Sequence, residues 1–232
     1  MPERYTIGVK AAQIKERYAV EVPKAYKARY NAAPTQLLPV IANDSPGGLS
    51  FFYWGTTPDW SKNKTISTKL INADVESINQ KTSLKRALNS RRCIIPADGF
   101  YEWKRISKKG RVPHRFVLGN NEIFSIAGIW QEYEDENDTN IHTFMMITTE
   151  ANSSVSAIND RMPAIIDKNS EQKWLDESTS EDELFGMLTA YPADNMGSYT
   201  VAPAVNDPAN EGPSLIQVAP PADQFGNYSL FN

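Results

Sequence analysis

Cysteine and histidine are both scarce in this sequence. Its 232 residues include one cysteine, Cys93, and two histidines, His114 and His142. A single cysteine excludes an internal disulfide, and these three residues do not provide the sets of Cys and His ligands that structural zinc sites use. We therefore expect a protein of a reducing cytoplasm that holds no metal and needs no cofactor.

The chain also lacks a long apolar run and an excess of positive charge. No stretch approaches the ~20 apolar residues of a membrane span, and the charged N-terminal segment MPERYTIGVKAAQIKERY lacks the apolar core of a signal peptide. With 24 Lys and Arg against 28 Asp and Glu, the formal net charge is −4, so a nucleic-acid site would have to be a local basic patch. We expect a soluble monomer that does not bind membranes.

The rest of the composition is that of a folded protein. Hydrophobic residues make up 41% of the chain, charged residues 22% and aromatic residues 10%, far from the composition of disordered proteins. The length suits one large domain. We expect that domain to span residues 1–232, with the last ~10 residues as a loose tail.

Strand and helix patterns alternate and predict a mixed α/β domain of the α+β class. Residues 29–42 contain Pro34 and Pro39, which predicts an extended segment at a sheet edge. The acidic run at residues 132–138 predicts a solvated hairpin loop, and six prolines in the last 40 residues predict a segment that wraps over the fold. Strand-like stretches occur at residues 5–9, 49–55, 91–105 (with an Asp-Gly turn), 114–118, 123–130 and 142–149. Helical spacing occurs at residues 11–20, 75–88, 171–178 and 181–190, the last two with Ser170 and Ser180 as N-caps.

Three polar residues lie where chemistry could occur, and each has a structural alternative. Glu102 follows the Asp-Gly turn and sits between aromatic residues, where an apolar wall can raise a carboxyl pKa and suit the group to acid–base catalysis. The alternative is a solvent-facing glutamate that pairs with Lys104. Asn72 either orients a substrate or satisfies a turn, and Arg161 either binds phosphate or pairs with a carboxylate such as Asp160.

Two tryptophans and a threonine are further candidates for contact with a nucleic acid. Trp60 and Trp103 either stack on bases, which contributes about 1–3 kcal/mol per base, or belong to the core. Thr148, at the end of a strand-like stretch, is an ordinary strand residue whose hydroxyl group could also make a contact.

The order of several sequence blocks is more specific than any one residue. From the N-terminus these blocks are RYT, RYNAAP, YWG followed by P.W, INAD.E, CIIPADGFYEWK, TT before INDRMP, and VAPAVND before N and P.LI. They extend from Arg4 to Ile216, and this succession resembles the SOS response-associated peptidase (SRAP) family. The resemblance implies a strongly twisted, mostly antiparallel sheet or barrel with peripheral helices.

The resemblance also implies an activity on damaged DNA. Members of the family bind single-stranded DNA with an abasic site and crosslink to the sugar aldehyde through an N-terminal cysteine, which forms a thiazolidine. In this chain Pro2 occupies the position of that cysteine, so a thiazolidine is excluded. Cys93 does not replace it, because it lies in an apolar strand-like stretch before the PADG turn.

The other catalytic positions of the family are partly retained. Asn72 and Glu102 match its active-site Asn and Glu, whereas Asn159 stands where the family has a His and cannot titrate near neutral pH. Asp74 replaces a phosphate-binding Arg that is frequent in the family. DNA-contacting positions of the family are matched by Arg4, Pro34, Trp60, Trp103, Thr148 and Arg161.

A local basic patch is a further expectation. The predicted helix at residues 75–88 and the residues that follow it carry Lys81, Lys85, Arg86, Arg91 and Arg92. These side chains form either a DNA-binding patch or an ordinary solvated helix face.

Three functions remain open from the sequence. In the first, removal of Met1 leaves the secondary amine of Pro2 as a nucleophile that forms a reversible Schiff base with an abasic site and promotes strand cleavage. In the second, a catalytically degenerate paralogue acts as a DNA-binding or scaffold protein. The third is a hydrolase with a Ser or Thr nucleophile, for which no motif places an activating His.

Overall fold

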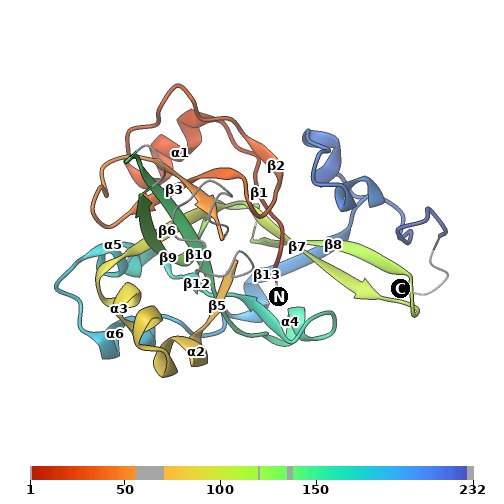
Figure 1. Cartoon of the computed structure of the whole chain (residues 1–232). Helices are drawn as coiled ribbons and strands as arrows, with labels where there is room; N and C mark the ends of the chain where they lie inside the picture. Colours follow the sequence, from red (N-terminus) through yellow and green to blue (C-terminus); the bar gives the residue numbers. More distant parts are fainter. Residues whose placement is uncertain (1, 56–70, 120, 135–137, 229–232) are drawn as a thin grey trace.

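Two β-sheets and a set of short peripheral helices make up the fold (Figure 1). The computed structural model describes residues 2–55, 71–119, 121–134 and 138–228. No helix in these ranges is long and apolar enough to cross a membrane. The mixture of a mostly antiparallel barrel, a second sheet and separate helices confirms the predicted α+β class.

The larger sheet closes into a barrel. Its strand order is β11-β10-β4-β3-β6-β9-β12, and β10 pairs with β9 as well as with β4, which completes a ring. Strand β5 extends the sheet beside β10, in parallel. The strands of the larger sheet are β3 (Leu37–Ala42), β4 (Ser50–Trp54), β5 (Asn72–Asp74), β6 (Arg92–Ala97), β9 (Phe124–Glu134), β10 (Asn140–Glu150), β11 (Arg161–Pro163) and β12 (Ile165–Ile166).

The interior of the barrel explains why its strands are almost continuously apolar. Side chains such as Leu38, Ile95 and Ile126 are fully buried, and the rings of Trp54 and Phe144 stack with centroids 6.1 Å apart. β-Branched and aromatic residues favour the extended backbone and fill the space between strands. This barrel is the rigid support of the site described below.

The smaller sheet is antiparallel, in the order β13-β8-β7-β1-β2. The chain passes to it from the barrel at Asp98, which separates β6 from β7. Asp98 accepts hydrogen bonds from the Thr6 hydroxyl and from the Gly8 amide (3.0 Å), and it forms an ion pair with Arg115 (3.2 Å). The strands of the smaller sheet are β1 (Tyr5–Ile7), β2 (Arg29–Ala32), β7 (Gly99–Arg105), β8 (Arg111–Leu118) and β13 (Met196–Thr200).

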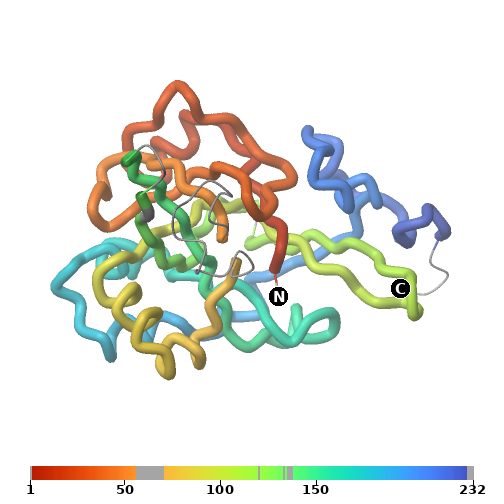
Figure 2. Tube along the Cα trace, viewed as in Figure 1, coloured from red at the N-terminus to blue at the C-terminus, as the bar shows by residue number. Residues whose placement is uncertain are grey.

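Only glycine fits at the start of β7. A Cβ atom at Gly99 would lie 2.6 Å from Nε of Arg115, whose guanidinium group crosses this corner. The Asp-Gly pair therefore forms a bend that joins the two sheets, and β7 continues from it into a hairpin with β8. This hairpin projects away from the barrel in Figure 2.

The helices are short and lie outside the sheets. The sequence predicts one helix at residues 75–88, and this prediction is wrong in one respect. The structure has two helices there, which meet at Lys81, a residue with an extended backbone (φ −108°, ψ 113°). Ser170 and Ser180 are confirmed as N-cap residues. The helices are α1 (Ala11–Tyr18), α2 (Val75–Gln80), α3 (Thr82–Ser90), α4 (Ser153–Ser156), α5 (Glu171–Leu175) and α6 (Glu181–Gly186), with 3-10 turns η1 (Lys168–Ser170), η2 (Ala193–Asn195), η3 (Pro203–Asn206) and η4 (Pro213–Ile216).

The C-terminal segment wraps over one face of the β7–β8 hairpin, as its prolines predicted, and it also contributes strand β13, which the sequence did not predict. Val201 and Val205 pack with Tyr101 in a small buried cluster. The Trp103 indole donates a hydrogen bond to Asn206 Oδ1 (2.6 Å). One face of the hairpin is therefore covered, and the other is left for the site.

Two further expectations need correction. The strand that contains Pro39, β3, is not at a sheet edge, because it lies between β4 and β6. Proline is tolerated there because Pro39 faces Phe51 on β4, while the pairing with β6 involves only Ile41 and Ala42. The acidic run also begins within β9, which continues to Glu134 and pairs there with Asn140.

Candidate functional site

The start of the chain lies beside β7. The Tyr101 amide donates a hydrogen bond to the Arg4 carbonyl (3.0 Å), which continues the antiparallel pairing of Tyr5 with Phe100. Residues 2–4 therefore run along β7 toward Glu102 and enter the region between β5, β7 and α4 (Figure 1). Pro2 is buried there.

Asn72 holds this segment in place. Its Nδ2 atom donates a 2.7 Å hydrogen bond to the Pro2 carbonyl. Asn72 opens β5, which pairs in parallel with β10, so its backbone is fixed by the barrel. Its Oδ1 atom is buried and has no hydrogen-bond partner among the described residues. An unpaired buried acceptor of this kind is costly and is suited to a ligand that donates a hydrogen bond.

Glu102 lies on β7 and only 4% of its surface is exposed. Its Oε2 atom accepts a 2.8 Å hydrogen bond from Asn159 Nδ2, whereas Oε1 is buried with no partner among the described residues. Burial raises the pKa of Glu102 to about 7, against the opposing effects of the positive amino terminus and of the Asn159 hydrogen bond. The carboxyl group therefore changes protonation near neutral pH, as acid–base catalysis requires.

Asn159 connects Glu102 to the barrel. It lies between α4 and β11, and its Oδ1 atom accepts a hydrogen bond from the Arg161 amide (3.1 Å). The amide side chain is thus oriented at both ends, with the donor toward Glu102. The structure brings Pro2, Asn72, Glu102 and Asn159 together from four distant parts of the chain.

This arrangement offers two buried oxygen acceptors beside the start of the chain. They suit an amine, a hydroxyl group or another hydrogen-bond donor, and a protonated Glu102 can also donate. No group of three or more His, Cys, Asp or Glu side chains in the described ranges is placed to hold a metal ion.

Arg161 is occupied by acidic neighbours. Its guanidinium group lies 3.5 Å from Asp74 Oδ1 and 3.0 Å from Glu76 Oε2. It also donates to the Thr148 carbonyl (2.7 Å). Thr148 is fully buried, and its hydroxyl group donates to Asp74 (2.6 Å). The structure thus has the carboxylate pairing among the two alternatives for Arg161, with Asp74 and Glu76 as partners in place of Asp160.

The other predicted DNA-contacting residues are more dispersed. The Arg4 guanidinium group donates hydrogen bonds to Asn31 Oδ1 (2.9 Å) and to the carbonyl groups of Val205 and Asn206. Trp103 is partly buried beside Tyr101. Pro34 lies in the turn between β2 and β3 and is partly exposed. Trp60 lies outside the described residues.

The expected basic patch is smaller than the sequence suggested. Lys81, Arg86 and Arg91 are exposed, but Lys85 forms an ion pair with Glu181 (2.7 Å). Arg92 is fully buried, because its guanidinium group donates to carbonyl groups at the end of α3 and around the end of α5. Its inclusion in a surface patch was wrong.

One residue that the sequence analysis did not place at the site lies next to it. His114 on β8 is the cross-strand partner of Glu102. The available signal was the short turn at residues 106–110, which pairs DGFYEWK with RVPHRFVL as a hairpin and thereby sets the register.

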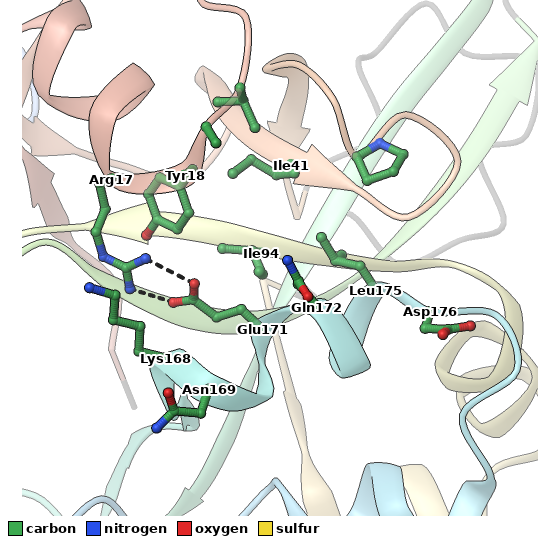
Figure 3. A pocket seen from close by; sticks show the side chains of 13 residues that line it. Arg17, Tyr18, Ile41, Ile94, Lys168, Asn169, Glu171, Gln172, Leu175 and Asp176 are labelled. Atoms are coloured by element: carbon green, nitrogen blue, oxygen red, sulfur yellow. Dashed lines mark hydrogen bonds and ion pairs between the residues drawn. The ribbon is translucent and has the colours of Figure 1, made fainter.

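A cavity of about 700 Å³ opens elsewhere, between α1, β3 and α5 (Figure 3). None of the predicted site residues lines it. The polar side chains of its wall connect α1 to α5. Arg17 donates hydrogen bonds to both carboxylate oxygens of Glu171, and the Ser125 hydroxyl group also donates to Glu171. The predicted site residues therefore lie apart from this cavity.

Comparison with known proteins identifies the family. The family model for the SOS response-associated peptidase (SRAP) matches residues 1–208. The chain belongs to the SRAP family. This confirms the resemblance inferred from the sequence blocks and the fold expected with it.

Relatives within the SRAP family have informative names. Abasic site processing protein YoqW of Bacillus subtilis is 37% identical over 219 residues, which are 92% of this chain and 98% of that protein. Abasic site processing protein YoaM of the same organism is 40% identical over 82% of this chain and 85% of its own length. A crystal structure of a protein from Bacteroides thetaiotaomicron has a TM-score of 0.82 and 26% identity, covering 93% of this chain and 99% of that one.

Proposed function

We propose that this chain processes abasic sites in single-stranded DNA by Schiff-base chemistry at the amine of Pro2. Its SRAP relatives are named abasic site processing proteins, and an abasic sugar in its open form carries an aldehyde. The observation that carries the proposal is the position of Pro2, which is buried beside Glu102 with its carbonyl bound by Asn72.

The nucleophile requires removal of Met1, which leaves Pro2 with a secondary amine. An α-amino group has a pKa of about 7.7–8.0, so a useful fraction is uncharged at neutral pH. The amine adds to C1′ of the aldehyde, and a proton from the Glu102 carboxyl group allows the resulting hydroxyl group to leave as water. The product is an iminium ion, and the carboxylate that remains is neutralised when it next takes up a proton.

Asn72 and Asn159 position these groups in the proposed reaction. The hydrogen bond from Asn72 fixes the backbone of Pro2 where the start of the chain runs beside β7. The hydrogen bond from Asn159 occupies Oε2 of Glu102 and leaves Oε1 for the reacting atoms. Arg161 would contribute to phosphate binding once it exchanges its carboxylate partners for DNA.

A non-catalytic DNA-binding or scaffold role is the second candidate. The specific observation in its favour is the ion pairing of Arg161 with Asp74 and Glu76, together with the absence of an N-terminal cysteine. In a site that only binds DNA, the hydrogen bond between Asn72 and the Pro2 carbonyl group would still stabilise the fold.

Borohydride trapping distinguishes the two candidates. The mature N-terminus is first established by intact mass, and the protein is then incubated with single-stranded DNA that carries one abasic site, with and without borohydride. We expect a covalent adduct on a denaturing gel only when reductant is present, and cleaved strand when it is absent. DNA without the abasic site is the matched control.

Protein that retains Met1, made by inhibiting methionine aminopeptidase during expression, tests the nucleophile. We expect it to trap poorly because the Pro2 nitrogen is then part of a peptide bond. Equal trapping by both forms would exclude Pro2. Binding to the same DNA with neither an adduct nor cleavage would favour the scaffold role.

A further inference from the structure

The Schiff-base reaction proposed above, on which this inference rests, needs two proton transfers. Loss of water from the first adduct needs a proton donor, and strand cleavage needs an acceptor for the proton on C2′ of the sugar. Glu102 can act as the donor. Its neighbour Asn159 is an amide and does not accept a proton in this pH range. The Glu102 carboxylate left by the first transfer can accept a proton, so a separate acceptor requires a second titratable group beside Glu102.

His114 lies on the same face of the β7–β8 hairpin as Glu102. The two residues are direct cross-strand partners, and the partners Phe100 and Phe116, two positions nearer the barrel, stack with centroids 5.1 Å apart. Directly opposed residues share one face and have Cβ atoms about 4.5–5.5 Å apart. The Cβ atoms of His114 and Glu102 are therefore neighbours on this face of the hairpin.

The opposite face of the hairpin is not available for a substrate. Tyr101 and Arg115 face that side, where Arg115 donates to the Tyr199 hydroxyl (2.6 Å) and Tyr101 packs against Val201 and Val205. His114 lies on the other face of the hairpin, which the C-terminal segment does not cover, and it is partly buried.

The charged groups around His114 keep its ring neutral. Burial lowers the pKa of His114, and the positive charge of Lys104, on the same face of β7, lowers it further. The neighbours on its own strand, Val112 and Phe116, are apolar, and on β13 it faces Thr200, whose hydroxyl group donates to the Ala219 carbonyl. Glu102, whose pKa is raised to about 7, and His114, whose pKa is lowered, therefore place an acid and a base on one face of the hairpin.

We propose that His114 is the proton acceptor for strand cleavage at this site. Its unprotonated ring nitrogen takes the proton from C2′, and the C2′–H electrons form a double bond to C1′ as the iminium nitrogen regains its lone pair. The resulting enamine expels the 3′ phosphate as the C3′–O bond breaks. Water then hydrolyses the iminium ion and releases Pro2 from the unsaturated aldehyde.

The second histidine of the chain provides a matched control. His142 lies on β10, six residues before Thr148, which corresponds to about 20 Å along a strand. Its ring stacks on Phe52 with centroids 4.9 Å apart and is 3.8 Å from Glu132. A His142→Gln substitution therefore removes an imidazole of similar exposure far from Glu102.

The test separates iminium formation from strand cleavage. Single-turnover reactions of wild type, His114→Gln, His114→Asn and His142→Gln with abasic single-stranded DNA are followed by borohydride trapping and by the rate of cleavage. We expect both His114 variants to trap the adduct as wild type does but to cleave about 100-fold more slowly, without the acid-side inflection of the wild-type pH profile. The His142 variant should behave as wild type.

Rescue by added imidazole provides a readout that a structural defect would not give. His114→Ala should regain cleavage as the imidazole concentration rises, while its trapping stays constant. Cleavage by the His114 variants within twofold of wild type, or an equal loss of trapping and cleavage in folded protein, would overturn the assignment and leave Pro2 as the nucleophile. Absence of any wild-type adduct would remove the proposed function and this inference together.

Discussion

At the scale of single residues, Glu102 makes the stability of the fold depend on pH. Its pKa in the folded protein is raised from an ordinary value of 4.5 to about 7 by burial. The protonated form fits the folded state, so its contribution to stability is complete below about pH 4.5 and is lost as the pH rises through 7. Glu102→Gln keeps the group neutral at every pH.

We expect Glu102→Gln to have nearly the stability of wild type at pH 5 and to exceed it at pH 8.5. The gain corresponds to the avoided cost of a buried carboxylate and should be on the order of 2–3 kcal/mol. Urea unfolding at both pH values measures it, with exposed Glu150→Gln as the control. A difference from wild type that is the same at both pH values would show that Glu102 is not the titrating group.

At the scale of elements, Arg92 joins α3 to α5. Its buried guanidinium group donates to the carbonyl groups of Leu88, Asn89, Trp174 and Asp176 at distances of 2.6–2.8 Å. A lysine has one nitrogen and cannot satisfy all four acceptors. We expect Arg92→Lys to lower the free energy of unfolding by about 2–4 kcal/mol, measured by urea denaturation. Exposed Arg91→Lys should change it little, and equal effects would refute this role.

A second prediction concerns the contact between α2 and β11. Asp74 and Glu76 neutralise Arg161 and compete with phosphate groups for it. We expect Asp74→Asn combined with Glu76→Gln to tighten binding to single-stranded DNA several-fold at low salt. The plot of log affinity against log salt concentration should become steeper by about 0.7, the value for one additional phosphate contact.

The control for that experiment is Glu16→Gln combined with Asp194→Asn, which makes the same change in net charge at exposed positions outside the site. Fluorescence anisotropy over a salt series measures both pairs. Equal changes in the two double variants would indicate a general charge effect and would leave Arg161 without a part in DNA binding.

At the scale of the whole molecule, Asn31 ties the first part of the chain to the last. Its Nδ2 atom donates to the carbonyl groups of Val205, Asp207 and Asn210, while its Oδ1 atom accepts from Arg4. These contacts join segments that are more than 170 residues apart in sequence. They hold the C-terminal segment on the hairpin and orient the strand that carries Pro2 into the site.

We expect Asn31→Ala to lower the free energy of unfolding by about 2–3 kcal/mol, because the buried carbonyl groups lose their donors. Limited proteolysis should also cleave residues 203–210 more rapidly than in wild type. Exposed Asn195→Ala provides the control. An unchanged proteolysis pattern would mean that the other contacts of the segment are sufficient to hold it.

The sequence by itself determined the family, the α+β class and the most strongly patterned elements. Apolar stretches of strand length such as residues 123–130 predicted buried strands, and the ordered blocks INAD, DGFYEWK and INDRMP predicted Asn72, Glu102 and Asn159 as one set. Short-range signals were also sufficient for the N-cap positions Ser170 and Ser180, and Ser180 forms a capping box with Glu183, three residues away.

Only the tertiary structure decided the state of the charged groups. The sequence does not reveal that Arg92 is buried or that Arg161 faces two carboxylates, because each depends on contacts between distant segments. The pKa of a carboxyl group follows from its burial and from neighbours brought together by the fold. For this reason the sequence alone predicted the site residues, whereas the fold set their burial and their hydrogen-bond partners.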